Sequence, residues 1–509
     1  MKKKPIITSK EAVNLINDGD SVAVEGSGGG LVEPDALLKS LKDRYKETLT
    51  PKNLTLVHCT GIGDREGGGI GHLAQENLIK RVIAGNWAMA PKMGEMALDN
   101  KIEAYNFPQG VMAKMFREIA AGNPGLLSRV GKETFVDPDY QGGRLNEITT
   151  EELVEKYNWD GETYLFYKKF PLNVTFIRAT TADEEGNLTI EEEGARLELL
   201  SMAQATHNNG GIVIAQVKRV VKSGTLQACK VIVPGIIVDY LVVHPEQKQT
   251  AEGIYNPSFS GNARISTNLL KPMNLNERKV VARRAYQELE NNNIVNLGVG
   301  MPDGVARIAE EKGMLDKITL TIEQGLVGGI PAQGLIFGVS YNPDAMIDQP
   351  YQFDFYHGGG LDTTFLGFGE VDKKGNVNAS KLGRLLTGTG GFVDISQNAS
   401  KVIFCGTFSS GGLKVNIENG KVNINQEGKY KKFVNNVQQI TFNGEYSQTN
   451  KQEVIYVTER AVFKATREGI MLMEIAPGID LEKDILNHME FKPLMPPEGI
   501  ITMDARLFE

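Results

Sequence analysis

Residues 294–303 read Ile-Val-Asn-Leu-Gly-Val-Gly-Met-Pro-Asp, a short apolar run followed by a glycine turn and a proline. This order predicts a strand over 294–297 and a helix that opens at Pro302, because proline is favoured at the first helical position. Glycines at the end of a strand let backbone N–H groups approach a ligand, and the next helix N-terminus is electropositive. A need for tight turning alone would also explain these glycines. The stretch predicts an α/β fold with strand ends suited to a phosphate-bearing ligand.

The same order occurs once before, where residues 21–24 (Ser-Val-Ala-Val) precede the glycine turn 26–30 and Pro34. The following apolar runs also correspond, residues 54–61 against residues 318–325. Strands that alternate with helices imply a largely parallel sheet, whose ligands bind off the carboxyl ends of the strands. The chain therefore predicts two related open α/β domains with largely parallel sheets, duplicated and fused.

A third correspondence supports the duplication. Asp-Glu-Glu-Gly-Asn at 183–187 matches Asp-Lys-Lys-Gly-Asn at 372–376, and each follows a β-rich run. Gly-Asn is typical of a tight turn or hairpin. The first half is about 80 residues longer between its matched points, which predicts an insertion at about 85–165.

The expected domain boundaries follow from these correspondences. The stretch 245–279 carries scattered Pro, Gly, Asn and Ser and predicts a linker. We expect an N-terminal domain over residues 1–260 that contains the insertion, and a C-terminal domain over residues 280–509.

Composition limits the kinds of partner. The 509 residues carry 55 basic and 63 acidic side chains, a net charge of −8, which argues against nucleic acid or an anionic membrane as a main partner. Three well-separated cysteines without a CxxC pair fit a reducing compartment. The most apolar stretch, 231–243, contains Pro234 and Asp239 and is too short to span a membrane, so it predicts buried sheet. We expect a cytoplasmic protein.

Familiar catalytic and metal-binding patterns are missing from the sequence. It contains no HExxH, no phosphate-binding Gly-x-x-x-x-Gly-Lys-Ser/Thr and no Gly-x-Ser-x-Gly. The six histidines are scattered, without a pair at metal-ligand spacing. No metal site is predicted.

Glu323 stands out among the acidic residues. It ends the predicted strand 318–322 and begins a glycine-rich turn, whereas the matching position of the first half is Cys59. The duplicated fold therefore does not itself require a carboxylate there. Glu323 is placed either for ligand chemistry or as a turn residue that bonds to nearby N–H groups.

A dinucleotide-binding reading competes at this point. Glu323 lies 25 residues after Gly298, which nearly suits an acid that holds a ribose hydroxyl. The glycines at 298, 300 and 304 miss the third position of that pattern, however. A nicotinamide-dependent oxidoreductase is therefore a weaker alternative.

Four motifs in order resemble those of family I CoA-transferases, and more narrowly the acetate/propionate CoA-transferase branch, in which both halves are fused. They are residues 296–302 (Asn-Leu-Gly-Val-Gly-Met-Pro), 321–325 (Thr-Ile-Glu-Gln-Gly), 352–362 (Gln-Phe-Asp-Phe-Tyr-His-Gly-Gly-Gly-Leu-Asp) and 388–392 (Gly-Thr-Gly-Gly-Phe). The resemblance runs nearly end to end. Two departures are Gln324, where the family often has Asn, and the glycine loop 26–34, which differs from the family's usual Gly-Gly-Phe version.

The resemblance implies a covalent mechanism. Glu323 would attack the acyl-CoA thioester and become a glutamyl-CoA thioester, with ping-pong kinetics. The side-chain amide of Gln109 and the backbone N–H of Gly391 would stabilise the oxyanion. Because Gln109 belongs to the first half and Glu323 to the second, the active site is expected between the two domains.

The resemblance also implies the ligands. CoA would be received by Gly298, Val299, Gly300, Met301 and Pro302, and by Gly358, Gly359 and Gly360. The expected activity is transfer of CoA between a short-chain acyl-CoA and a free carboxylate such as acetate or propionate, without a tightly bound cofactor, in a homo-oligomer of two or four chains. Beside the oxidoreductase, an acyl-CoA hydrolase and a catalytically silent CoA sensor remain as alternatives.

Overall fold

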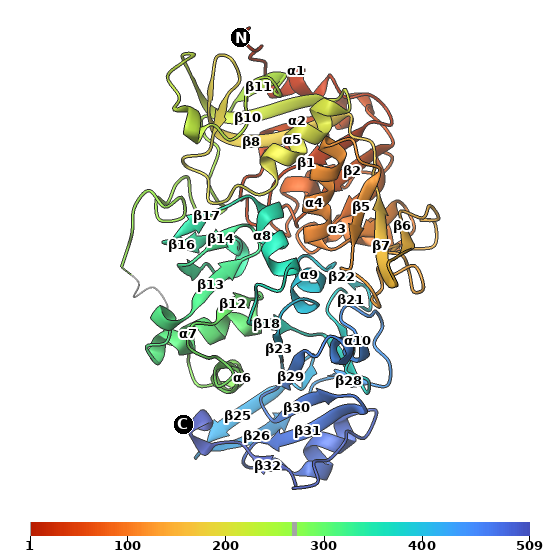
Figure 1. Ribbon diagram of the computed structural model, residues 1–509, viewed down its shortest axis with the longest axis vertical. Coiled ribbons are helices and arrows are strands. Elements are labelled where there is room, and N and C mark those ends of the chain that lie inside the picture. The colour runs from red at the N-terminus through yellow and green to blue at the C-terminus, as the bar shows by residue number, and fades with distance from the viewer. Residues whose placement is uncertain (1, 267–271) are drawn as a thin grey trace. The chain divides into compact units, whose positions relative to one another are not determined.

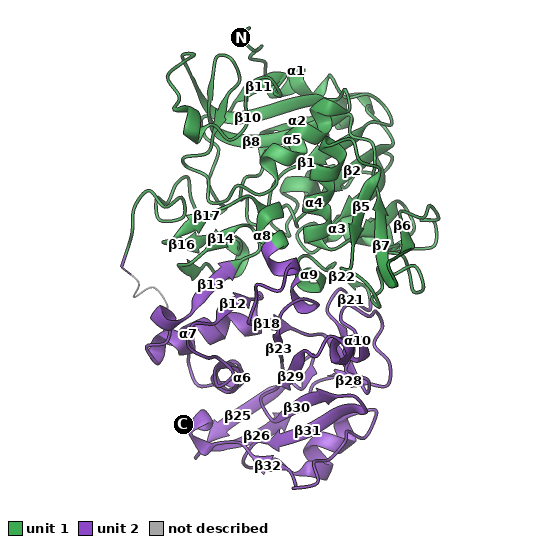
Figure 2. Cartoon of the chain, viewed as in Figure 1, with its two compact units in different colours: residues 1–265, 322–354, 384–394 green, residues 266–321, 355–383, 395–509 purple. Residues whose placement is uncertain are grey.

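The computed structural model describes residues 2–266 and 272–509 (Figure 1). The chain forms two compact units, each assembled from three stretches of sequence. Unit 1 comprises residues 1–265, 322–354 and 384–394, and unit 2 comprises residues 266–321, 355–383 and 395–509 (Figure 2).

The main sheet of unit 1 is a path of parallel strands. Their order is β11 (Tyr240–Val243), β10 (Ile212–Val221), β8 (Val174–Asp183), β1 (Ser21–Val24), β2 (Leu54–His58), β3 (Ile79–Ala84) and β4 (Glu103–Asn106). The short β9 (Leu188–Thr189) pairs antiparallel with β8. Strands β1 and β8 are buried along their whole length, as expected for a parallel sheet covered on both faces.

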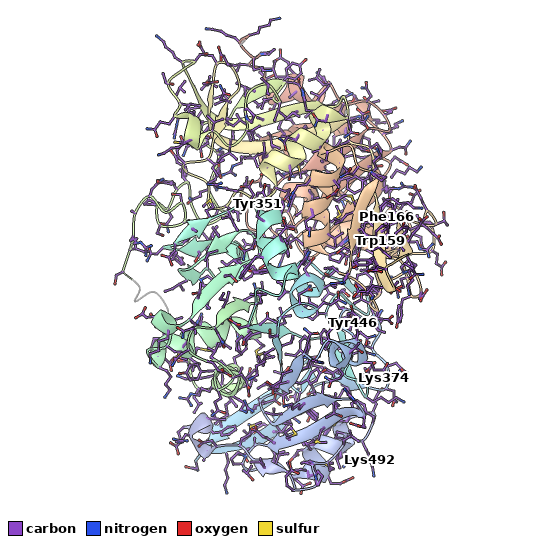
Figure 3. All side chains as sticks on the ribbon, in the orientation of Figure 1. Trp159, Phe166, Tyr351, Lys374, Tyr446 and Lys492 are labelled. Atoms are coloured by element: carbon purple, nitrogen blue, oxygen red, sulfur yellow. The ribbon has the colours of Figure 1, made fainter. Side chains whose placement is uncertain are left out.

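Helices and a small second sheet complete unit 1. The helices that lie wholly in it are α1 (Ser9–Val13), α2 (Asp35–Thr48), α3 (Pro91–Leu98), α4 (Gln109–Ala120) and α5 (Leu199–Asn208). Helix α1 packs on α2, and α4 packs on α5. The small sheet is antiparallel, with the order β5 (Gly125–Ser128), β7 (Glu162–Lys168) and β6 (Val154–Trp159). Figure 3 labels Trp159 and Phe166 on it.

The sheet of unit 2 begins with the same arrangement. Its strands follow the order β13 (Thr319–Ile322), β12 (Ile294–Leu297), β18 (Thr363–Gly367), β23 (Lys401–Cys405), β29 (Glu453–Val457), β30 (Ala461–Thr466), β31 (Gly469–Ile475) and β32 (Ile501–Thr502). From β13 to β29 the neighbouring strands are parallel, and β30 and β31 continue antiparallel. Helix α6 (Glu277–Tyr286) packs on α7 (Gly304–Glu311).

The two sheets correspond strand for strand. The order β2-β1-β8-β10-β11 in the first half equals β13-β12-β18-β23-β29 in the second. The pairing registers agree as well, since Val22 lies opposite Val174 and Val295 lies opposite Thr363. The prediction of two related, largely parallel α/β sheets in one chain is confirmed.

The predicted Gly-Asn turns are also confirmed, and they agree in their hydrogen bonds. In the first, Gly186 N donates to Asp183 O (2.9 Å) and Asn187 Nδ2 to Asp183 Oδ2 (2.8 Å). In the second, Gly375 N donates to Asp372 O (2.9 Å) and Asn376 Nδ2 to Asp372 Oδ2 (3.0 Å). Each turn connects antiparallel strands, β8 with β9 and β19 (Glu370–Asp372) with β20 (Val377–Asn378).

Three local predictions were wrong. Pro34 is the residue before α2 rather than its first residue, and Pro302 lies in a short 3-10 turn, Met301–Asp303, ahead of α7. In both places the proline precedes the first α-helical turn. The apolar stretch 231–243 forms a strand only over Tyr240–Val243, because Pro234 and Gly235 break it and Gly235 N donates to a turn residue instead.

The compact units do not follow the two contiguous ranges expected from the sequence. Residues 322–354 and 384–394, from the second half, belong to unit 1. The ranges 1–260 and 280–509 concern the duplicated halves and stay a prediction. Of the expected linker 245–279, residues 267–271 lie outside the described residues. No helix in the described part of the chain is both long and apolar enough to cross a membrane.

Candidate active site

Glu323 occupies a tight turn directly after β13. Gly325 N donates to Ile322 O (3.0 Å), and Gly325 adopts a φ of 100°, in the region that favours glycine. A side chain at Gly325 would place its Cβ 2.1 Å from Ile347 O, so only glycine fits. The turn leaves Glu323 partly exposed, between buried neighbours. The strand end thus presents a carboxylate that is not enclosed in the core.

Gln109 lies at the first residue of α4, just after β4, and is almost fully buried. Its backbone N donates to Gly390 O (2.9 Å), and Gly390 N donates to Gly85 O (2.7 Å). A Cβ at Gly85 would lie 1.9 Å from Cys59 O, so glycine is required at this crossing too. These bonds hold Gln109 against the loop that contains Gly391.

The loop 387–391 is fastened at several points to the ends of β3 and β4. Trp87 N donates to Thr387 O (2.8 Å), and Thr389 N donates to Asn106 Oδ1 (2.9 Å). Gly391 is buried, and its N–H donates to no acceptor among the described residues. An N–H without a partner in such a rigid loop is suited to bind an oxyanion.

Gln349 connects Gln109 with the turn of Glu323, and no motif of the sequence marks it. Gln109 Nε2 donates to Gln349 Oε1 (3.4 Å), and a Cβ at Gly325 would lie 3.5 Å from Gln349 N. Gln349 N donates to Leu197 O (2.9 Å). Gln349 begins α8 (Gln349–His357) and is fully buried. Glu323, Gln109 and Gly391, which are far apart in the sequence, therefore all belong to unit 1.

Charged contacts of Asp354, in the second half of α8, hold this helix on α4. Asp354 accepts from Arg117 Nη1 (2.6 Å) and Lys114 Nζ (2.9 Å). The Arg117 guanidinium also lies 4.9 Å from the ring centre of Tyr351, which is labelled in Figure 3. The helix that begins at Gln349 is thereby anchored to α4.

Buried charges at neighbouring strand ends were missed by sequence reasoning. Arg178 lies in β8, just beyond the part of this strand that pairs with β1. It makes a bidentate ion pair with Glu193 (Nε to Oε1 3.2 Å, Nη2 to Oε2 2.9 Å). Glu25 follows β1, and its Oε2 accepts from Arg178 N (3.0 Å). Burial raises the pKa of Glu25 well above its ordinary value and that of Glu33 to about 8. A glutamate directly after the apolar run 21–24 was the available signal.

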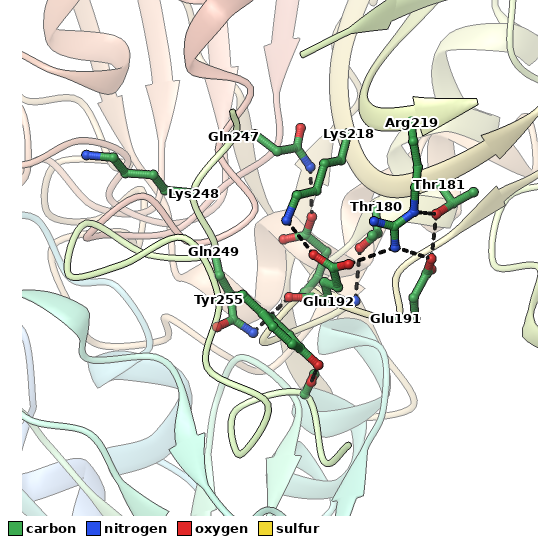
Figure 4. Close-up of polar contacts among 12 residues, drawn as sticks. Thr180, Thr181, Glu191, Glu192, Lys218, Arg219, Gln247, Lys248, Gln249 and Tyr255 are labelled. Atoms are coloured by element: carbon green, nitrogen blue, oxygen red, sulfur yellow. Dashed lines mark hydrogen bonds and ion pairs between the residues drawn. The ribbon is translucent and has the colours of Figure 1, made fainter. Parts of the chain in front are cut away.

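This buried pair supports the glycine loop 26–30. Arg178 Nη1 donates to Gly30 O (3.2 Å), and Nη2 to Lys248 O (2.6 Å). Ala251 N donates to Gly29 O (2.6 Å), so the segment around residue 250 covers the loop. A network on the adjoining strands holds that segment in turn (Figure 4). It joins Lys218 and Arg219 to Glu191 and Glu192, with Gln249 donating to Glu192 O.

The residue that matches Glu323 in the first half, Cys59, is shielded from solvent. Cys59 is fully buried, and the carboxyl of Glu198, at the start of α5, lies against its thiol. Burial raises the pKa of Glu198 to about 7, and it lowers the pKa of the adjacent His58 to about 4. Neither Glu198 oxygen accepts a hydrogen bond of ordinary geometry from the described residues.

The expected CoA loop, residues 298–302, belongs to unit 2. Gly298 N donates to Phe365 O (2.8 Å), and Val299 is 47% exposed. Gly300 has a φ of 93° and faces open space, and Arg278 Nη2 donates to its carbonyl (2.8 Å). An exposed glycine turn beside a guanidinium is suited to an anionic ligand.

The other predicted CoA residues, Gly358, Gly359 and Gly360, follow α8 in unit 2. Gly360 N donates to Phe355 O (3.0 Å) and Gly359 N to Tyr356 O (3.0 Å), a bonding pattern that ends a helix. A Cβ at Gly360 would lie 2.4 Å from the Phe355 ring. The helix end alone therefore accounts for two of these glycines. Within the described ranges no group of three His, Cys, Asp or Glu side chains could hold a metal ion.

Known proteins resemble the chain over nearly its whole length. It is 47% identical over 505 residues to YdiF, an acetate CoA-transferase of Escherichia coli (strain K12), covering 99% of this chain and 95% of that protein. It is 45% identical over 511 residues to caffeate CoA-transferase of Acetobacterium woodii, covering 99% and 97%. The coenzyme A transferase family model matches residues 6–244.

The fold gives the same answer. The crystal structure of the acyl-CoA transferase YdiF apoenzyme from Escherichia coli O157:H7 matches with a TM-score of 0.96 and 46% identity, covering 100% of this chain and 96% of that chain. A thioester complex of that enzyme with CoA matches with a TM-score of 0.95 and the same identity and coverage. Since sequence and fold agree over nearly the whole chain, the chain belongs to the coenzyme A transferase family and is itself a CoA-transferase.

Proposed function

We propose that this enzyme transfers CoA between a short-chain acyl-CoA and a free carboxylate such as acetate or propionate, through a glutamyl-CoA thioester on Glu323. The observation that carries the proposal is the position of Glu323, partly exposed in a turn that Gln349 ties to Gln109. The names of the relatives add support, because one is an acetate CoA-transferase and another is solved as a thioester complex with CoA.

The proposed steps balance without an oxidant or a metal. A carboxylate oxygen of Glu323 attacks the acyl-CoA carbonyl, and the thiolate of CoA leaves to give a mixed anhydride. The thiolate then attacks the Glu323 carbonyl and releases the first acid, leaving CoA on the enzyme. An incoming carboxylate reverses both steps and departs as the new acyl-CoA.

Each tetrahedral intermediate carries a negative oxygen that needs donors. We assign this role to the amide of Gln109 and the N–H of Gly391, both buried in unit 1. In a water-poor site a preorganised donor contributes about 10²–10³ in rate. The bonds from Gln109 N to Gly390 and from Gly390 N to Gly85 support that preorganisation.

For CoA itself we propose Gly298, Val299, Gly300, Met301 and Pro302, with Arg278 as the nearby positive charge. Gly358, Gly359 and Gly360 complete the proposed contact set. CoA acts as a substrate, and no tightly bound cofactor is part of the proposal. A cytoplasmic homo-oligomer of two or four chains completes it, on the family resemblance and the three free cysteines.

The proposal of a short acyl group rests on Met89. A Cβ at Gly28 would lie 3.0 Å from Met89 Cε, and one at Gly61 would lie 2.8 Å from Met89 Cγ. Met89 thus fills the space beside two glycines of unit 1, one of which, Gly61, also adjoins Asn86. Overall identity does not choose between acids, because the acetate and caffeate enzymes are 47% and 45% identical to this chain.

The test is peptide mass spectrometry after the protein is mixed with acetyl-CoA and quenched in acid. We expect a CoA adduct on the peptide that contains Glu323. Glu323→Gln should lose the adduct, and Glu310→Gln, a change on helix α7, should keep it. No adduct in the wild type with acetyl-, propionyl- or butyryl-CoA would contradict the covalent scheme.

The alternatives differ in what they consume. An acyl-CoA hydrolase would release CoA without added carboxylate, whereas the transferase needs the acceptor acid. A nicotinamide-dependent oxidoreductase would bind a dinucleotide tightly and form a hydride product, and a silent sensor would bind CoA without exchange.

A further inference from the structure

Asn86 is a polar residue in unit 1 to which the proposed mechanism gives no role. It follows β3 directly after Gly85, in the segment that is fastened to the loop 387–391. Its Oδ1 accepts from Ala88 N (2.9 Å), which closes a local turn. Because oxygen is the acceptor in this bond, the orientation of the amide is determined, and Nδ2 must lie on the opposite side.

That Nδ2 points to the loop that carries the proposed oxyanion donor. A side chain at Gly390 would place its Cβ 3.4 Å from Asn86 Nδ2 and 3.5 Å from Gln109 Oε1. Both amide ends therefore border the side of Gly390 where glycine carries no side chain. Gly391 follows directly in the chain, and its N–H has no acceptor among the described residues. Among the described residues the side chain of partly exposed Asn86 makes one hydrogen bond, which is the bond accepted by Oδ1.

The amide of Gln349 explains how Gln109 presents a donor at the same point. Gln349 is fully buried and its Nε2 has no partner among the described residues, while its Oε1 faces Gln109 Nε2. Rotating both amides by half a turn exchanges O and N in place. Gln349 Nε2 then donates to Gln109 Oε1, and Gln109 Nε2 turns to the space above Gly390. The exchanged arrangement keeps the one hydrogen bond between the two amides and leaves the acceptor Gln349 Oε1, instead of the donor Gln349 Nε2, without a partner among the described residues, while Gln109 Nε2 becomes available to a ligand.

We propose that Asn86 is a further catalytic residue, whose Nδ2–H donates to the oxyanion together with Gln109 and Gly391. The inference rests on the proposed function and deepens it. When Glu323 adds to the acyl carbonyl, the C–O bond forms and the π electrons move to the carbonyl oxygen. The three N–H groups bind that oxygen until its electron pair re-forms the C=O double bond and the C–S bond breaks. The same donors serve the return attack of the thiolate.

Three substitutions separate the donor from the turn. Asn86→Ser and Asn86→Asp both keep an oxygen that can accept from Ala88 N–H, whereas Asn86→Ala removes turn and donor together. Serine adds no charge, so it also separates donor loss from the repulsion that aspartate introduces. Asn123→Ser, at an exposed amide that donates to Glu118, is the matched control.

The measurement is the rate of thioester formation on Glu323 by rapid acid quench, together with kcat and KM for acetyl-CoA. We expect Asn86→Ser, Asn86→Asp and Asn86→Ala each to lower kcat about 10²-fold, with KM changed less than about threefold. Asn123→Ser should leave both values unchanged. Thermal unfolding of the Ser and Asp variants should match that of the wild type.

A wild-type rate in Asn86→Ser and Asn86→Asp, with loss only in Asn86→Ala, would show that Asn86 merely closes the turn. That outcome overturns the inference and leaves the proposed function intact, provided that the wild type forms the adduct on Glu323. Failure of the wild type to form any adduct would instead overturn the proposed function. The two failures are thus distinguishable in one series of quenches.

Discussion

The ends of β2 and β13 occupy the same position in two copies of one sheet, yet they differ in every chemical respect. Strand β2 leads into Cys59, which is fully buried against Glu198, and β13 leads into Glu323, which is partly exposed. The neighbouring strand ends differ in the opposite sense. Glu25 and Arg178 of the first half match Gly298 and Gly367 of the second, by the shared register. One copy carries a buried ion pair there, and the other carries glycines at the same positions.

The comparison teaches that duplication preserved the scaffold and released the strand ends. The sheet order, the registers and the Asp-x-x-Gly-Asn turns agree between the copies, because they depend on backbone bonding and, in the turns, on the same Asp–Asn side-chain bond. Side chains at the carboxyl edge carry no part of that bonding and were free to diverge.

The sharpest test substitutes the residue at each of the two matched strand ends. Glu323→Gln should lower the rate of CoA transfer by at least about 10⁴-fold, because the nucleophile is lost while the shape is kept. Cys59→Ala should stay within about threefold of the wild type. The measurement is acetate-dependent exchange from propionyl-CoA at saturating substrate. Substantial transfer by Glu323→Gln would mean that the two strand ends do not differ in function.

The second test removes the positive charge of the buried ion pair in the first copy. Arg178→Met should destabilise the fold by about 3–5 kcal/mol, because it leaves the buried carboxylate of Glu193 without its partner. Arg219→Met, which breaks ion pairs of a 43% exposed side chain, should cost at most about 1 kcal/mol. Urea unfolding of both variants gives the difference. Equal costs would refute the view that burial makes the Arg178 pair structural.

The third test concerns the contribution of the first half to chemistry. Gln109→Ala should lower kcat about 10²–10³-fold with little change in the midpoint of thermal unfolding. Gln204→Ala, a partly exposed amide on α5, serves as the control and should leave kcat unaltered. A loss of only a few-fold at Gln109 would remove it from the proposed oxyanion site.

The smallest effect is expected from the acid beside Cys59. Burial raises the pKa of Glu198 to about 7, above its ordinary value of 4.5, so the folded protein retains a proton that the unfolded chain loses. Stability due to this group is therefore complete below pH 4.5 and falls as the pH rises to about 7. Glu198→Gln should remove a decline of up to about 3 kcal/mol over that range.

The measurement is urea unfolding at pH 5 and at pH 8 for both proteins. Wild type and Glu198→Gln should differ more at pH 8, with the variant the more stable. An unchanged pH dependence would mean that Glu198 is ionised in the folded protein, and that the first-half strand end is less dry than its burial indicates.

Much of the fold was accessible from the sequence, because the repeat is local and periodic. The apolar runs 21–24 and 294–297 became strands with the predicted bounds, and both Gly-Asn turns formed. The helix starts at Pro34 and Pro302 were wrong by one or two residues, since proline tolerates several positions before the first helical turn.

The candidate site was accessible only in part. Glu323, Gln109 and Gly391 were found through motifs, and their roles stay a prediction. Gln349 and Asn86 carry no motif, because their importance depends on which segments the fold brings together. Likewise, nothing local marks Arg178 as the partner of Glu193. The compact unit that joins residues 322–354 and 384–394 to the first half cannot be read from a contiguous repeat.

The backbone bond from Trp87 to Thr387 has an optical consequence. The chain has two tryptophans: Trp159 is 62% exposed, whereas Trp87 is buried next to Asn86 and its ring lies 2.9 Å from where a Cβ on Gly388 would sit. In a Trp159→Phe variant the remaining emission would come from Trp87, which is hydrogen-bonded to the loop that holds Gly391. Stopped-flow fluorescence of that variant would then time the arrival of an acyl group without any attached dye.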